Sequence, residues 1–241
     1  VRGRKDLENL TIPFIGEIPL FTRKKKGILG KKPQEVKAVI VKEGNRDIIN
    51  EAFRVLRTNL EFMTGKDKTS NVIIMTSFNP GSGKSFLTMN IAVSLAIKGK
   101  KVLVIDGDLR HASASSYIDS PDKGLSDYLG GRIDNLDEII VPDPTIDTVR
   151  EQYDYVLIDC PPVELVADTQ IIEKLADRTV FVVRAGLLER SMLAELEKIY
   201  EEKKYKNMSL ILNGTEGSGG RYGYRYGYRY GYHYGYGSGY H

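Results

Sequence analysis

The sequence predicts an α/β protein in which a doubly wound, mostly parallel sheet is flanked by helices and followed by a flexible C-terminal tail. Three observations lead to this class. Short apolar runs rich in β-branched residues alternate with helical patterns through the middle of the chain. One such run leads through a glycine-rich loop into a helix, which is the arrangement of a P-loop protein. No aliphatic residue follows Leu212, so the end of the chain lacks the side chains that build a core.

The first part of the chain, residues 1–45, is predicted to be a connector. Prolines and a glycine interrupt its apolar stretch LTIPFIGEIPLF, and a cluster of arginine and lysine follows at 23–32. A helix is expected at 46–63, because apolar residues recur there at spacings of three and four and Gly65 follows as a stop signal. The chain of 241 residues carries a net charge of +3, which by itself indicates no particular partner.

Strands and helices then alternate as far as residue 214. Each expected strand is a short β-branched run suited to burial on both faces of a parallel sheet. The strands are expected at 71–77, 101–106, 153–159, 178–184 and 208–214. The accompanying helices are expected at 84–98, 168–177 and 190–205. This alternation favours helices on both faces of the sheet.

The glycine-rich loop reads NPGSGKS, from Asn79 to Ser85, and is similar to a Walker A phosphate-binding loop. Gly81 and Gly83 let the backbone turn so that successive N–H groups point at an anion, and the N-terminus of the following helix adds positive charge. Lys84 is expected to reach the outer phosphates, and the hydroxyl of Ser85 to bind Mg²⁺. The loop therefore predicts binding of a nucleotide together with Mg²⁺.

Acidic residues end two of the predicted strands. Asp106 and Asp108 in VLVIDGDLR share one face at the end of their strand, and Asp159 in YVLIDCPP ends another. Because the carboxyl ends of parallel strands form the active-site edge of such a sheet, these carboxylates are expected around the phosphate loop. The single cysteine, Cys160, cannot form an internal disulfide and is interpreted as a packing residue.

Together these motifs resemble the cytoplasmic kinase domain of the bacterial tyrosine kinases (BY-kinases) of polysaccharide export. NPGSGKS is similar to their Walker A loop, VLVIDGDLR to their Walker A′ and YVLIDCPP to their Walker B, while EAFRVLR resembles their oligomerisation motif. Partitioning ATPases of the same superfamily carry an extra lysine early in the loop, where this chain has Asn79. The resemblance covers nearly the whole chain and implies a juxtamembrane connector at 1–45, a P-loop kinase domain at 46–214 and an autophosphorylation tail at 215–241.

The resemblance implies an ATP-dependent protein-tyrosine autokinase. Lys84, Asp106 and Asp108 are the expected catalytic residues, with Asp106 as the base that accepts the phenolic proton. Ser85, Asp106 and Asp159 are the expected Mg²⁺ ligands. The residues expected to contact ATP are Pro80, Gly81, Ser82, Gly83, Lys84, Ser85 and Phe86 and, as an adenine contact by superfamily analogy, Asn213.

The resemblance also implies partners. Glu51, Arg54 and Arg57 project along one side of a helix and are expected to pair across the contacts of a homo-oligomeric ring, an octamer in the family. LTIPFIGEIP resembles the stretch after the last transmembrane helix of members that carry a membrane-embedded chain-length regulator on the same polypeptide. The family further implies a cognate tyrosine phosphatase, a place at the cytoplasmic face of the bacterial inner membrane, and a role in capsular or exopolysaccharide synthesis and export.

The tail is the expected substrate, phosphorylated in trans by a neighbouring subunit, and the added charge is expected to regulate oligomerisation. The expected phosphoacceptors are Tyr222, Tyr224, Tyr226, Tyr228, Tyr230, Tyr232, Tyr234, Tyr236 and Tyr240. Three other interpretations stay open. The tail could bind nucleic acid through stacking and arginine, although no nucleic-acid partner is expected. The chain could be an ATPase switch without kinase activity, or the tail could join chains through stacked phenols.

The chain departs from the family pattern in two places. Phe78 stands where a Walker A loop usually begins with a small residue. Near 147–148 the chain runs on to the strand at 153–159 without the further strand and proline-rich segment that the family usually has. Either this chain is a short member, or a disordered segment is missing from the sequence there. The difference concerns substrate handling rather than the phosphate site.

Overall fold

A computed structural model describes residues 1–21, 38–64, 71–108, 114–117, 121–124, 126–127, 130–135, 138–139, 153–163 and 176–216. Within these residues six strands form a single sheet. They are β1 (Phe14–Pro19), β2 (Asn71–Thr76), β3 (Val102–Asp106), β4 (Tyr155–Asp159), β5 (Arg178–Arg184) and β6 (Ser209–Thr215). The five strands expected from the sequence are all present, and β1 is an addition to them.

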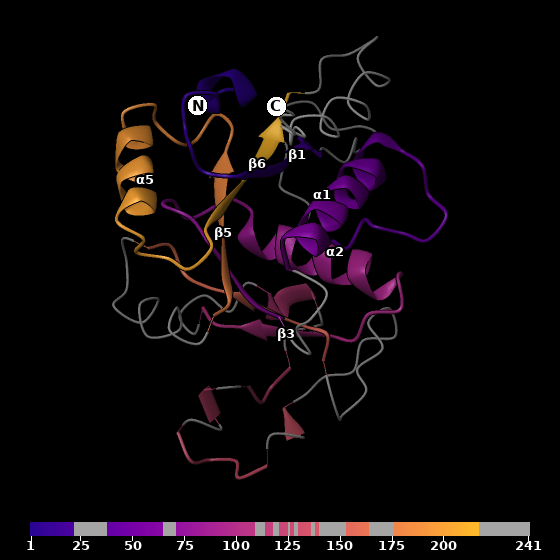
Figure 1. The fold of residues 1–241 in the computed structure, drawn as a ribbon. Helices are drawn as coiled ribbons and strands as arrows, with labels where there is room; N and C mark the ends of the chain where they lie inside the picture. The colour runs from indigo at the N-terminus through magenta and orange to yellow at the C-terminus, as the bar shows by residue number, and fades with distance from the viewer. Residues whose placement is uncertain are drawn as a thin grey trace, which may run out of the picture.

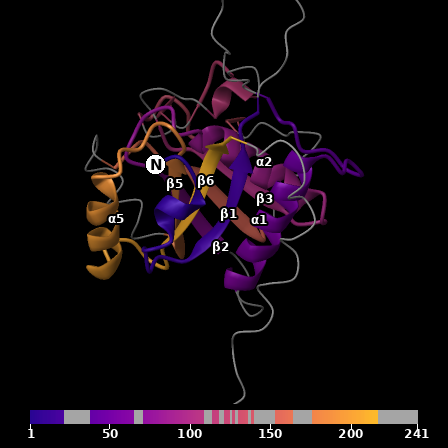
Figure 2. The ribbon, with the colours of Figure 1, turned by 90° about the horizontal axis from the view of Figure 1, so that it is seen from above.

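The order across the sheet is β1–β6–β5–β2–β4–β3, and every pairing is parallel. Figures 1 and 2 show β1, β6 and β5 next to one another in this sheet. The strand that leads into the phosphate loop, β2, lies between β4 and β5. All strands therefore end at one edge, where the loop and the two acidic strand ends meet.

Helices cover both faces of this sheet, as the sequence predicts. The helices α1 (Ile48–Thr64) and α2 (Lys84–Ala96) lie on one face, and α5 (Met192–Glu201) lies on the other (Figure 1). Most of the helix expected at 168–177 falls outside the described residues. None of the helices in the described part of the chain combines the length and hydropathy needed to cross a bilayer.

Side chains of β5 show why a continuous apolar run suits this position. Val180 and Val182 pack into the core beneath α1 and α2, while Phe181 and Val183 pack into the core beneath α5. All four are at most 1% exposed. Because successive side chains of a strand point to opposite faces, a strand covered on both faces needs apolar residues at every position.

The edge strand β1 lies within the stretch that the sequence predicts as a connector. It pairs in parallel with β6, and the pairing continues as the N–H of Leu20 donates to the carbonyl of Thr215 (2.8 Å). Ile18 is fully buried. A Cβ on Gly16 would lie 2.9 Å from Leu56 Cδ1, so a glycine lets α1 pack closely on the strand. The sheet therefore includes residues 14–19, and proline and glycine concealed the strand pattern in the sequence.

Candidate nucleotide site

The phosphate loop is held in shape by its own hydroxyl groups. Ser77 Oγ and Ser82 Oγ both donate to the carbonyl of Asn79, at 2.9 and 2.8 Å. Gly81 and Gly83 have φ values of 74° and 88°, in the region that favours glycine. The helix α2 begins directly after Gly83, so its first N–H groups are directed at the loop. This arrangement is a preformed anion site.

Asn213, at the end of β6, supports the loop from the β6 side. Its Nδ2 donates to the carbonyl of Ser82 at 2.9 Å. A Cβ on Gly83 would lie 2.2 Å from that nitrogen, so only glycine fits there. The amide that the sequence assigned to adenine is thus bonded to the loop in this structure, and the adenine contact stays a prediction.

Lys84 lies in the buried first turn of α2. Its side chain is directed at the loop, with Nζ 3.5 Å from Ser77 Oγ. Burial lowers the pKa of Lys84, and the nearby carboxylates of Asp159 and Asp108 oppose this shift. Because the cation is partly desolvated, an anionic ligand beside it gains a stronger interaction than it would in water.

Asp159 is the most strongly perturbed carboxylate of the site. Its Oδ2 accepts a hydrogen bond from Ser85 Oγ, whereas its buried Oδ1 has no hydrogen-bond partner among the described residues. Burial raises the pKa of Asp159 to about 7, although the Ser85 hydrogen bond and Lys84 act in the opposite direction. A buried carboxylate oxygen without a partner, next to a hydroxyl, fits the oxygen ligands that Mg²⁺ prefers.

The described residues contain no cluster of three or more histidine, cysteine or acidic side chains arranged to hold a metal. Mg²⁺ commonly binds through one or two protein oxygens plus phosphate oxygens and water. Ser85 and Asp159 are a pair of this kind, and their role as Mg²⁺ ligands stays a prediction.

Asp106 and Asp108 lie beside Asp159, at the end of the neighbouring strand. Asp106 is the β-sheet partner of Asp159, and the N–H of Gly107 donates to the carbonyl of Asp159 (2.8 Å). The structure thus brings together the three carboxylates, as predicted. Asp108 is buried, and its N–H donates to Asp106 Oδ1 at 3.3 Å.

Ser115 is a site residue that the sequence did not reveal. Both its N–H and its Oγ donate to Asp106 Oδ2, each at 2.8 Å. It belongs to a short 3₁₀ turn, Ser115–Tyr117, beyond the end of β3. A serine in a polar stretch of sequence does not indicate a functional role. Only the folded structure shows that Ser115 orients the carboxylate of Asp106.

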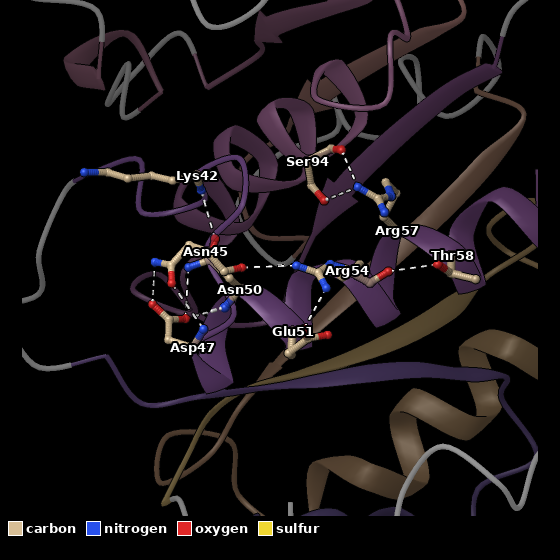
Figure 3. Close-up of polar contacts among 9 residues, drawn as sticks. All are labelled: Lys42, Asn45, Asp47, Asn50, Glu51, Arg54, Arg57, Thr58 and Ser94. Atoms are coloured by element: carbon tan, nitrogen blue, oxygen red, sulfur yellow. Dashed lines mark hydrogen bonds and ion pairs between the residues drawn. The ribbon is translucent and has the colours of Figure 1, made fainter. Parts of the chain in front are cut away.

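The predicted oligomerisation residues on α1 separate into two groups (Figure 3). Arg54 forms an ion pair with Glu51 (2.6 Å) and donates to the carbonyl of Asn45 (3.1 Å), and both charged side chains are more than 40% exposed. Arg57 points the other way and is buried. Its Nη1 donates to the carbonyl of Ser94 in α2 at 2.8 Å. Arg57 therefore joins two helices of one chain in this arrangement, and only Glu51 and Arg54 lie at the surface.

The predicted phosphoacceptor tyrosines all lie beyond residue 216, outside the described residues. The basic cluster at 23–32 and the departure near 147–148 lie outside them too. Thr215, the last residue of β6, is at the edge of the sheet that carries the phosphate loop. Cys160 is buried, and burial raises its pKa to about 12, which agrees with a packing role.

Comparison with known proteins defines the class of the chain. Residues 73–221 match the family model of the CobQ/CobB/MinD/ParA nucleotide binding domain. This match runs from within β2 to beyond the end of β6, and it includes the phosphate loop and the acidic strand ends. The chain therefore belongs to this nucleotide-binding family.

Within this nucleotide-binding family, the chain is similar to tyrosine-protein kinases. The tyrosine-protein kinase CpsD of Streptococcus agalactiae is 32% identical over 201 residues, which cover 72% of this chain and 86% of CpsD. EpsB of Ralstonia solanacearum, inferred to be a tyrosine-protein kinase, is 36% identical over 204 residues, 72% of this chain but only 27% of EpsB.

Solved structures agree with these relatives. The kinase domain of the Escherichia coli tyrosine kinase ETK superposes with a TM-score of 0.74 at 26% identity, covering 95% of this chain and all of that one. The BceF tyrosine kinase domain gives 0.69 at 27% identity, with 89% and 98% covered. The chain is a member of the bacterial tyrosine-protein kinases, and the resemblance stated from its motifs is confirmed.

Proposed function

We propose that this kinase domain transfers the γ-phosphoryl group of Mg-ATP to tyrosines of its own C-terminal tail. The observation that carries the proposal is the Ser85–Asp159 contact, with the second oxygen of Asp159 left without a partner beside the phosphate loop. This hydroxyl and this carboxylate lie at the place where a phosphate loop presents its Mg²⁺ ligands.

The loop and Lys84 hold the phosphates in the proposed mechanism. Backbone N–H groups around Gly83 and the start of α2 bind the phosphate oxygens, and Lys84 neutralises negative charge that develops on them. Ser85 and Asp159 hold Mg²⁺, which neutralises phosphate charge when bound. ATP is the nucleotide expected of this family, and the residues 80–86 are the proposed contacts.

A carboxylate must take the proton of the attacking phenol, whose ordinary pKa is near 10. We assign Asp106 as this base, with Asp108 in support, because Ser115 orients Asp106 at the strand end next to Asp159. In the transfer, the phenolic oxygen forms a bond to the γ-phosphorus and the bond to the leaving ADP oxygen breaks. The phenolic proton passes to the carboxylate.

Transfer in trans requires neighbouring subunits, and the outer surface of α1 is suited to a second copy of the chain. Ile48 and Phe62 are 80% and 82% exposed and Val55 is 55% exposed, all on the side of the helix that carries the Glu51–Arg54 pair. A ring built on this surface, an octamer in the family, would place each tail near the next active site. Phosphorylated tails repel one another and thereby regulate the ring.

The wider setting of the proposal extends beyond the described residues. The chain spans 27% of EpsB, so a membrane-embedded chain-length regulator on the same polypeptide remains a proposal. We also propose the domain limits 1–45, 46–214 and 215–241 and a cognate tyrosine phosphatase. The proposal further includes a place at the cytoplasmic face of the inner membrane and a role in capsular or exopolysaccharide export.

Mass spectrometry of the protein after incubation with Mg-ATP tests the proposed function. The wild type is expected to carry phosphate on tail tyrosines, whereas Lys84→Met is expected to lose at least about a hundredfold in rate, because its loop lacks the phosphate-binding cation. An unmodified tail in the wild type would reject tail autophosphorylation. ADP release without phosphotyrosine would favour the ATPase switch instead.

A further inference from the structure

Arg184 lies against the phosphate loop, although no sequence motif includes it. It ends β5, and its guanidinium covers Gly214, so closely that a Cβ on that glycine would lie 2.6 Å from Cζ. Its Nη1 is 3.8 Å from the position that a Cβ on Gly83 would take. A permanently charged group therefore lies between the end of β6 and the loop residue that precedes α2.

The order of strands shows which half of the nucleotide would meet this group. On one side of β2 lie β4 and β3, which bring Asp159 and Asp106 to the loop. On the other side lie β5 and β6, which bring Arg184 and Asn213. The phosphate that is transferred must lie near the metal pair and the base, on the acidic side. The nucleoside half of the ligand then leaves the loop on the side of β5 and β6.

We propose that Arg184 is a nucleotide-binding residue that contacts the α-phosphate and sugar of ATP. The inference rests on the proposed use of this site for ATP. A guanidinium presents several donors in one plane and no acceptor, which suits phosphate and hydroxyl oxygens. It also adds positive charge on the β5 and β6 side of the loop, whereas Lys84 is expected to reach the outer phosphates.

Gly214 makes room for the guanidinium. Its φ of 74° lies in the glycine region, and any side chain would displace Arg184. The substitution Gly214→Ala should therefore weaken nucleotide binding through Arg184. Combined with Arg184→Gln, it should add little further loss, since both changes remove the same contact.

Calorimetry with two probes tests the inference. Mg-ADP contains the nucleoside half, and inorganic Mg-tripolyphosphate does not. Tripolyphosphate keeps the counterpart of the α-phosphate but lacks the sugar. Arg184→Gln is therefore expected to weaken ADP binding about tenfold, the usual effect of losing a hydrogen bond to a charged group, and tripolyphosphate binding only about threefold. Arg184→Lys should bind ADP with intermediate affinity, because it keeps the charge without the planar fork.

Arg190→Gln is the matched control, because Arg190 follows the same strand but pairs with Asp6 at the surface. It should change neither affinity. Equal ADP binding in Arg184→Gln and Arg190→Gln would overturn the inference. An equal loss for both probes would overturn it too, because Arg184 would then make no contact with the sugar. This test is independent of the kinase proposal, because ADP binding requires no phosphotransfer. The role of Arg184 in ADP binding would stand even if the tail were not phosphorylated.

Discussion

Asp159 is ordinary in the sequence, as one acidic residue after an apolar strand, and exceptional in the folded protein. The residue is 1% exposed, and burial raises the pKa of its carboxyl group to about 7. At pH 5 this carboxyl group is charged in the unfolded chain but neutral in the folded protein. Raising the pH removes the proton from the folded protein, so the free energy of unfolding falls. Burial therefore disfavours the charged form of Asp159, and a bound cation would favour it.

The raised pKa predicts that Asp159→Asn becomes more stable relative to the wild type as the pH rises. The native pKa of about 7 lies above the unfolded value of 3.8, so the cost of this carboxyl grows from pH 4 and is complete above pH 7. In chelator, the free energy of unfolding of Asp159→Asn relative to the wild type should rise by about 2–3 kcal/mol between pH 5 and pH 8. Urea unfolding at both pH values measures it. A constant difference would show that Asp159 titrates normally.

At the scale of elements, α1 has one exposed side and one side packed against α2. Its outward side carries Glu51 and Arg54, while its inward side carries Arg57, which reaches the carbonyl of Ser94 in α2. The segment before α1 is attached to α2 as well, because Asn90 Oδ1 accepts from the N–H groups of Ile40 and Val41, at 2.8 and 3.1 Å. The helix that begins with Lys84 is thus packed directly against the helix expected to meet a neighbour.

The two arginines of this helix should behave differently when replaced. Arg57→Ala is expected to lower the free energy of unfolding by about 2–3 kcal/mol, because it removes a buried hydrogen bond and the packing of a long stem. Arg54→Ala should cost less than about 1 kcal/mol, because its ion pair is exposed, but it should reduce oligomerisation.

Urea unfolding and sedimentation velocity separate the two effects. If Arg57→Ala left stability unchanged and dissociated the oligomer, Arg57 would have to be an interface residue, against the contact with Ser94.

At the scale of the whole molecule, the sheet extends further than its motifs suggest. The strand β1 is joined to β6 along the edge, and residues before it contact α5, where Thr11 N donates to Glu197 Oε1 (3.0 Å). The stretch expected to lead toward a membrane therefore contributes a strand to the sheet. The strand β1 lies next to β6, which carries Asn213, and β6 in turn lies next to β5, which ends at Arg184.

Replacing residues of β1 measures this attachment. Ile18→Ala should lower the free energy of unfolding by about 2–4 kcal/mol, because Ile18 is fully buried. Leu20→Ala, two residues later, is the control and should cost less than about 1 kcal/mol, because Leu20 is 43% exposed. Equal and small effects in denaturant unfolding would mean that β1 behaves as a loose connector.

The sequence by itself determined the fold class, the phosphate loop and the acidic strand ends. Each of these depends on residues close together in the chain: a glycine pattern, an apolar run and the charge that follows it. The family could be stated for the same reason. The roles assigned to Asp106 and Asp108 and the tyrosine acceptors remain predictions.

Only the tertiary structure decided that β1 belongs to the sheet, that Arg57 faces inward, and that Ser115 and Arg184 reach the site. Each depends on contacts between residues distant in the chain. Arg184 and Gly83 are about a hundred residues apart and meet because β5 lies next to β2. Strand order depends on how all the elements pack together, so no local pattern of residues could place that guanidinium beside the loop.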